Sequence, residues 1–137
     1  SQKENEPVPK ALKGTETILV VDDEEVVLEV GVKILEKLGY EVLEANSGKK
    51  AVEVCKANLG KIELVILDVV MPGMSGGDTF DEIKKLDPNM KVLLSSGYTI
   101  DGQAKTIMAR GCDGFIQKPF SLQTLTDKLN ELMLPKS

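Results

Sequence analysis

A short apolar run that ends in a carboxylate and an irregular loop constrains the fold of this chain most strongly. Residues 64–67 read Leu-Val-Ile-Leu, and Asp68 follows them directly. The length of the run and its β-branched residues favour a strand buried on both faces over a helix. Pro72, Gly73 and Gly76 then predict a loop. An Asp at the carboxyl end of a buried parallel strand lies where open α/β sheets bind their ligands, although alone it is equally compatible with a simple turn.

Apolar runs of this kind alternate with amphipathic helical patterns along the chain. The strands that they predict are residues 17–21, 41–45, 64–67, 91–95 and 113–116. A helical pattern follows each strand, and the first predicts an inner face of Val27, Val30, Ile34, Leu35 and Leu38. Ser47 and Ser121 are the predicted N-caps of the second and fifth helices. Five strands that alternate with five helices predict one α/β domain, a doubly wound parallel sheet covered on both faces.

Length, charge and composition narrow the classes of protein to which the chain can belong. Its 137 residues give room for one domain with a sizeable core. With 17 Lys and Arg residues against 22 Asp and Glu residues, the net charge is −5, so neither nucleic acid nor an anionic membrane is expected as a direct partner. No apolar run approaches the roughly 18 residues of a membrane span, and no signal-peptide pattern opens the chain. Cys55 and Cys112 are isolated in the sequence, which favours a reduced, cytoplasmic protein over one with a disulfide. The absence of His and of a Cys-x-x-Cys motif argues against a zinc site.

Polar residues capable of chemistry follow four of the five predicted strands. Asp22 and Asp23 follow the first strand, Asp68 the third, Ser96 the fourth and Lys118 the fifth. Taken singly, each has an ordinary explanation: a helix N-terminus favours acidic residues, Ser96 suits a turn, and Lys118 suits a solvated surface. Because the carboxyl ends of parallel strands meet at one edge of a sheet, we expect these side chains to converge. Together they predict a functional site.

The chemistry of this set favours phosphoryl transfer to an aspartate. Three carboxylates at close range repel one another and call for a hard divalent cation, for which Mg²⁺ is the expected species. Such an ion aligns a phosphoryl group with a carboxylate nucleophile, and Asp68 is a competent nucleophile that would form an aspartyl-phosphate. Lys118 can pair with one phosphate oxygen, and Ser96 can donate a hydrogen bond to another.

Four motifs resemble the receiver domain of two-component response regulators. They are Val-Val-Asp-Asp-Glu at 20–24, Leu-Asp-Val-Val-Met-Pro-Gly-Met-Ser-Gly at 67–76, Ser-Ser-Gly-Tyr at 95–98 and Phe-Ile-Gln-Lys-Pro-Phe at 115–120. The resemblance covers residues 15–134, and residues 1–14 are expected to be a flexible linker or tail. It implies a flavodoxin-like (βα)5 sheet in the strand order 2-1-3-4-5.

The resemblance also implies a role for each residue of the set. Asp68 would accept a phosphoryl group from a histidine of a sensor kinase or of a histidine phosphotransfer domain. Asp22 and Asp23 would hold Mg²⁺ together with Asp68 and the backbone carbonyl of Val70. Ser96 and Lys118 would bind the phosphoryl oxygens, and the Lys118–Pro119 bond is expected to be cis.

Signalling and the lifetime of the phosphoryl group are implied in the same way. Ser96 would move towards the phosphate and Phe115 would follow into the space that it leaves, which would remodel the surface of the fourth helix, fifth strand and fifth helix. Val70 and Tyr98 would flank the path of a hydrolytic water. Because Val70 cannot orient a water and Tyr98 is bulky, slow self-dephosphorylation is predicted.

Other classes of function fit the sequence less well. A phosphatase with an Asp nucleophile, similar to the haloacid dehalogenases, would carry a second Asp at position 70, where this chain has Val70. A flavin-binding electron carrier would need aromatic shields, and the chain has no Trp and only two Tyr. A receiver that serves only as a scaffold is least favoured, since no required side chain is missing. Within the receiver interpretation, residues 94–98 and 114–120 resemble the C-terminal receiver of a hybrid sensor histidine kinase, which we favour over a free-standing response regulator.

Overall fold

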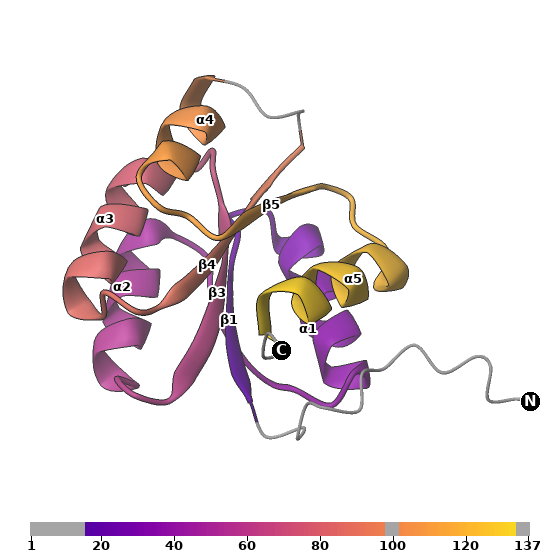
Figure 1. Cartoon of the computed structure of the whole chain (residues 1–137). Coiled ribbons are helices and arrows are strands. Elements are labelled where there is room, and N and C mark those ends of the chain that lie inside the picture. Colours follow the sequence, from indigo (N-terminus) through magenta and orange to yellow (C-terminus); the bar gives the residue numbers. More distant parts are fainter. Residues whose placement is uncertain (1–15, 98–101, 134–137) are drawn as a thin grey trace, which may run out of the picture.

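The computed structural model describes residues 16–97 and 102–133 of the chain. Within these ranges, strands and helices alternate without exception (Figure 1). The predicted linker at 1–14 and the predicted lifetime residue Tyr98 lie outside the described residues.

A five-stranded parallel sheet forms the centre of the molecule. Its strands are β1 (Thr17–Val21), β2 (Glu41–Ala45), β3 (Ile62–Asp68), β4 (Lys91–Ser96) and β5 (Gly114–Gln117). They lie in the order β2-β1-β3-β4-β5, which confirms the predicted topology. From β1 the chain first adds β2 on one side and then adds β3, β4 and β5 on the other side. The place between β1 and β3, where the direction changes, is the topological switch point of the sheet. Ligands of open α/β sheets bind at the carboxyl end of such a switch point.

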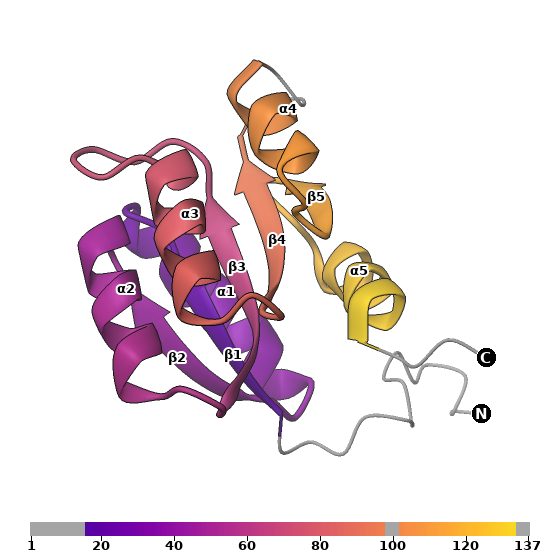
Figure 2. The same cartoon turned by 60° about the vertical axis from the view of Figure 1, so that its left-hand side comes forward.

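Five helices cover the two faces of the sheet. They are α1 (Glu25–Lys37), α2 (Gly48–Ala57), α3 (Gly76–Leu86), α4 (Gly102–Ala109) and α5 (Leu122–Met133). Helices α1 and α5 pack on one face, and α2, α3 and α4 pack on the other (Figures 1 and 2). Each face has its own apolar core, because alternate residues of the buried strands point to opposite sides of the sheet.

Serine side chains cap the first turn of three helices. Ser47 accepts a 3.1 Å hydrogen bond from the backbone N–H of Lys50, which confirms it as the N-cap of α2. Ser121 likewise accepts a 3.1 Å bond from the N–H of Thr124 at the start of α5. Ser75 does the same for α3, with the N–H of Asp78 at 3.1 Å. A cap of this kind typically contributes about 1 kcal/mol to stability. Helix α1 is different, because Glu24 at its N-cap makes no side-chain cap hydrogen bond.

The buried face of α1 differs from the one that its apolar residues predict. Leu28, Gly31 and Leu35 are buried, whereas the side chain of Val30 is 47% exposed. The reason is Gly31, which carries no side chain and therefore adds nothing to an apolar pattern. A Cβ at Gly31 would lie 3.6 Å from Val20 and 3.7 Å from Phe120, so the helix approaches the sheet along this side. The predicted placement of Val30 in the core is therefore wrong.

Candidate functional site

Three carboxylates gather at the carboxyl edge of the two central strands. Val21 of β1 is in register with Leu67 of β3, so the residues that follow, Asp22 and Asp68, lie beside each other. One carboxylate oxygen each from Asp22, Asp23 and Asp68 lies within 4.8 Å of the other two. Asp22 and Asp68 are buried and Asp23 is exposed. The topology thus brings together the three acidic residues that the sequence singled out.

Lys118 reaches this acidic cluster from the end of β5. Its backbone N–H donates to the carbonyl of Ser96 at 2.7 Å, which extends the pairing of β4 with β5. Its ammonium donates to Oδ2 of Asp22 at 2.9 Å and to Oδ1 of Asp68 at 3.3 Å. The Lys118–Pro119 peptide bond is cis, as the motif led us to expect.

The cluster perturbs the protonation of its members. Burial first, and then the negative charge of Asp22, raise the pKa of the Asp68 carboxyl to about 7, although Lys118 acts in the opposite direction. Burial alone would lower the pKa of Lys118, but the hydrogen bond to Asp22 and the charges of Asp68 and Asp22 outweigh burial and raise it. The single ammonium therefore does not compensate three carboxylates, and the site retains an excess of negative charge.

The donor set fits a hard divalent cation. All the side-chain donors are carboxylate oxygens, which suit Mg²⁺, and they converge closely enough to share one ion. Two of the carboxylates are buried, so their mutual repulsion is poorly screened by water and a cation would relieve it. The cluster of Asp22, Asp23 and Asp68 therefore has the chemistry of a site for Mg²⁺.

A cavity of about 680 Å³ opens directly over the acidic cluster. Its lining comes from the loops after β1, β3, β4 and β5 and from the first turns of α1, and includes Asp23, Asp68, Val70, Ser96 and Lys118. Ser96 is buried, with 3% of its surface exposed. The structure therefore collects five of the predicted site residues around one opening.

Among the described residues, the predicted switch residue Phe115 is not part of the cavity lining. Phe115 is in register with Leu94 of β4 and packs, partly buried, against the core beneath α2, α3 and α4. Tyr98 lies outside the described residues, as noted above.

Glu24 and three valines of α1 line the cavity although the sequence did not single them out as site residues. Glu24 lies in the lining, and one of its oxygens, Oε1, is 3.9 Å from the ammonium of Lys118. Val26, Val27 and Val30 of α1 line the cavity, and Val26 and Val30 are exposed. The position of Glu24 directly after Asp22 and Asp23 was the sequence feature that could have predicted its place at the site.

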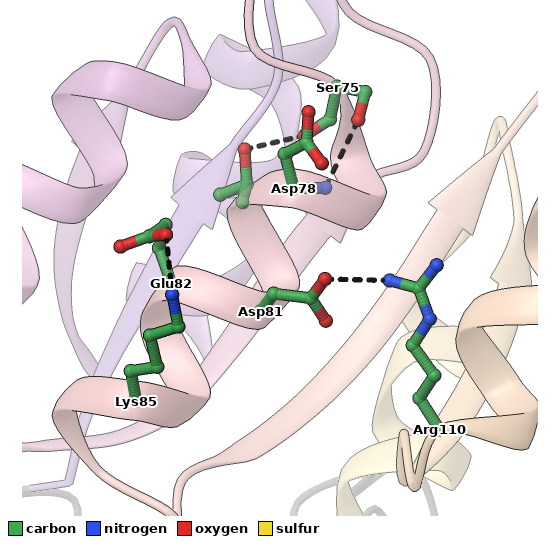
Figure 3. Close-up of polar contacts among 7 residues, drawn as sticks. Ser75, Asp78, Asp81, Glu82, Lys85 and Arg110 are labelled. Carbon is green, nitrogen blue, oxygen red and sulfur yellow. Dashed lines mark hydrogen bonds and ion pairs between the residues drawn. The ribbon is translucent and has the colours of Figure 1, made fainter.

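A second hollow, of about 950 Å³, lies between α3 and the turn after α4. Its charged groups pair with one another: Arg110 donates to Asp81 at 2.9 Å, and Lys85 lies 3.2 Å from Glu82 (Figure 3). Ser75 and the backbone of Asp78 are joined in the cap of α3. This hollow therefore lacks the uncompensated charge of the first cavity, and its lining includes none of the predicted site residues that the structure describes.

No helix in the described part of the chain is long and apolar enough to cross a membrane.

Comparison with known proteins agrees with this geometry. Residues 18–130 match the family model of the response regulator receiver domain. The sensor kinase CckA of Brucella abortus (strain 2308) is 39% identical over 122 residues, which cover 89% of this chain and 13% of the kinase. The chain thus spans about an eighth of the length of that relative.

Solved structures show the same fold. A response regulator receiver domain protein from Clostridium thermocellum superimposes with a TM-score of 0.79 at 35% identity, over 85% of this chain and 92% of that one. The CheX–CheY–BeF3–Mg²⁺ complex from Borrelia burgdorferi gives a TM-score of 0.82 at 25% identity, over 88% of this chain and 90% of that one. With a family match over most of its length, the chain belongs to the response regulator receiver domain family.

Proposed function

We propose that Asp68 is the phosphoacceptor of this receiver domain and takes its phosphoryl group from a phosphorylated histidine. As a receiver domain, the chain is a signalling module rather than an enzyme, and a histidine kinase or phosphotransfer protein is its general class of partner. The observation that carries the proposal is the position of Asp68: its buried carboxylate contacts Lys118 at the floor of an open cavity.

The reaction needs a carboxylate that can reach phosphorus and groups that compensate charge. An oxygen of Asp68 would attack the phosphorus while the bond to the histidine nitrogen breaks, so the phosphoryl group moves to Asp68 and the imidazole leaves. A bound Mg²⁺, held by Asp22, Asp23, Asp68 and the backbone carbonyl of Val70, would neutralise charge on the phosphoryl oxygens.

Lys118 and Ser96 are the residues proposed to bind the product. The ammonium of Lys118 already lies 3.3 Å from Asp68, so it is within reach of an oxygen attached there. Ser96 lies one residue beyond Ser95, the partner of Asp68 in the sheet register, and lines the same cavity. A hydroxyl at this position would donate to a second phosphoryl oxygen.

Ser96 and Phe115 are the proposed switch. Phe115 is only partly buried, and it packs against the core that α4 also contacts through Ala104 and Ile107. A displacement of Ser96 towards the phosphate would therefore be followed by the ring of Phe115 and would shift the surface formed by α4, β5 and α5.

Val70 and Tyr98 are the proposed determinants of phosphoryl lifetime. The side chain of Val70 is 53% exposed and lines the cavity, yet it offers no polar atom to orient a water. Tyr98, by its position two residues after Ser96, is proposed to cover the phosphate. We expect slow self-dephosphorylation, which suits a receiver that stores a signal or returns the phosphoryl group to a histidine.

The mouth of the cavity supports a protein as the phosphoryl donor. Val26, Val30 and Val70 are 71%, 47% and 53% exposed, and all three line this one opening. An exposed apolar cluster of this kind commonly marks a surface that binds another protein. The histidine-bearing partner would cover these valines while its imidazole reaches Asp68.

As the natural context we propose the C-terminal receiver of a hybrid sensor histidine kinase in the cytoplasm. The similarity to the receiver domain of the hybrid histidine kinase CckA supports a hybrid kinase as the parent protein. A free-standing response regulator is the alternative. The gene sequence on both sides of the region that encodes this chain distinguishes the two. Neither nucleic acid nor a membrane is proposed as a direct partner.

Incubation with acetyl phosphate tests the proposed reaction. With Mg²⁺, intact-mass measurement should detect one added phosphoryl group, and EDTA should prevent the addition. A generic phosphomonoester serves as the control for the phosphatase alternative, and we expect no turnover. Addition of the phosphoryl group in EDTA, or turnover of the monoester, would contradict the proposal.

A further inference from the structure

Helix α1 begins without the side-chain cap that Ser47, Ser75 and Ser121 give to three other helices. Its N-cap is Glu24, which is not among the residues preferred at this position. The side chain of Glu24 makes no cap hydrogen bond and instead places Oε1 3.9 Å from the ammonium of Lys118. Helix α1, which starts directly after Asp22 and Asp23, thus has no side-chain cap.

Both carboxylate oxygens of Asp22 are engaged by neighbours. Oδ1 accepts the backbone N–H of Glu24 at 2.9 Å, and Oδ2 accepts the ammonium of Lys118 at 2.9 Å. Lys118 also donates to Asp68 at 3.3 Å, so one ammonium holds two of the three carboxylates of the metal site.

Lys118 and a divalent cation therefore compete for the same acids. Mg²⁺ binds through carboxylate oxygens, and its charge repels an ammonium at close range. Metal binding requires Lys118 to give up part of its contact with Asp22 and Asp68. Among the described residues, the carboxylates within 4.0 Å of its ammonium are Asp22, Asp68 and Glu24, and Glu24 is the one outside the metal cluster.

Glu24 also has the freedom that such an exchange requires. Its side chain is 65% exposed, whereas that of Lys118 is 11% exposed and those of Asp22 and Asp68 are 3% and 4% exposed. An exposed carboxylate at the edge of the site has room to follow the ammonium, whereas the buried acids are enclosed by their neighbours.

We propose that Glu24 is a positioning residue that accepts the ammonium of Lys118 when a divalent cation occupies the acidic cluster, and that it thereby raises the affinity of the site for the cation. This inference rests on the proposed magnesium site. It assigns to Glu24 a role that acts through Lys118 and requires no direct contact with the metal.

Calorimetric titration of the unphosphorylated protein with Mg²⁺ tests this role. We expect Glu24→Gln to weaken Mg²⁺ binding by about 3-fold, within the range of a partly exposed ion pair. Glu25→Gln is the matched control, because Glu25 lies next to Glu24 in the first turn of α1 and carries the same charge but is not among the ion-pair partners of Lys118. We expect Glu25→Gln to change the affinity by less than about 1.5-fold. Equal effects of the two variants would overturn the proposal.

Titration of Lys118→Gln and of the Glu24→Gln/Lys118→Gln double variant distinguishes an action of Glu24 through Lys118 from a general effect of its negative charge on the metal. If Glu24 acts through Lys118, Glu24→Gln should weaken binding no further once Lys118 has been replaced. A persisting 3-fold loss would show that Glu24 acts on the metal by its charge alone and would overturn the positioning role. Failure of the wild-type protein to bind Mg²⁺ would overturn the metal site itself, whereas normal binding unaffected by Glu24→Gln would overturn only this inference.

Discussion

Lys118, at the end of β5, donates a 3.3 Å hydrogen bond to Asp68, at the end of β3, although 50 residues separate them in the chain. The contact exists because both strands end at the same edge of the sheet, with β4 between them. It places a buried carboxylate, its counter-charge and two further acids around one opening.

Asp68 should destabilise the metal-free protein at alkaline pH. Its pKa is about 7 in the folded state against an ordinary value of 3.8, so the folded state binds the proton more tightly than the unfolded state. The free energy of unfolding should therefore fall as pH rises from about 4 to about 7. In EDTA, Asp68→Asn should melt higher than wild type at pH 8, by on the order of 5 °C, and the difference should shrink towards pH 4. A difference that is constant across this range would contradict the assignment.

Asp23 should be required for stabilisation by Mg²⁺. The ion binds only the folded state, so at 100 times its Kd it should add about 2.7 kcal/mol to the free energy of unfolding of the wild type. Asp23→Ala removes one of the three carboxylates and should abolish the Mg²⁺-dependent rise in Tm. It should also raise the stability in EDTA, because it relieves repulsion within the cluster. Glu44→Ala, at an exposed position on β2, is the control and should leave the shift intact. An unchanged shift in Asp23→Ala would count against the site.

The exposed valines of α1 should affect the rate of phosphoryl transfer from a protein donor but not from a small-molecule donor. Val26→Glu combined with Val30→Glu should slow phosphoryl transfer from a phosphorylated histidine protein by about 10-fold, about 1.4 kcal/mol, because it places charge on an apolar contact surface. Phosphorylation by acetyl phosphate should proceed as in the wild type, since the small donor needs no docking surface. Leu59→Glu, at a 57% exposed position outside the cavity lining, is the control. Equal slowing with both donors would mean that the valines act on the site and not on the partner.

Val70 and Tyr98 should limit the loss of the phosphoryl group. Val70→Asn together with Tyr98→Glu supplies polar groups that can orient a water and should accelerate decay by roughly 10-fold, about 1.4 kcal/mol of barrier. The measurement is the decay of the phosphorylated protein in excess Mg²⁺ after the donor is removed. A double variant that decays no faster than its parent would refute control of water access by these side chains.

The sequence predicts the topology and the convergence of the site well, because both follow from strands that alternate with helices. It predicts strand boundaries less well. Strand β3 begins at Ile62 and not at Leu64, because Ile62 pairs with Thr17 of β1 across an irregularity in the register. Strand β5 lies one residue later than predicted, where Gln117 pairs with Ser96. The ends of both strands are set by hydrogen bonding to the neighbouring strand, and the amino-acid composition of one strand does not reveal that pairing.

Side-chain environments at the site were the least accessible to prediction. Val30 is an apolar residue, yet α1 buries Leu28, Gly31 and Leu35 and leaves Val30 exposed. The engagement of both oxygens of Asp22 depends on a backbone N–H and on a lysine from a distant strand. Residue types predicted which groups meet at the sheet edge, but the structure was needed to see which atoms pair.

Phosphorylation of Asp68 itself is the central claim, and one mapping experiment tests it directly. The protein is treated with acetyl phosphate and Mg²⁺ and then with borohydride, which reduces an aspartyl-phosphate to homoserine, and its peptides are analysed by mass spectrometry. The account predicts homoserine at position 68 in the wild type and no modified peptide in Asp68→Asn. Homoserine at position 22 or 23 in the wild type, or labelling that persists in Asp68→Asn, would contradict it.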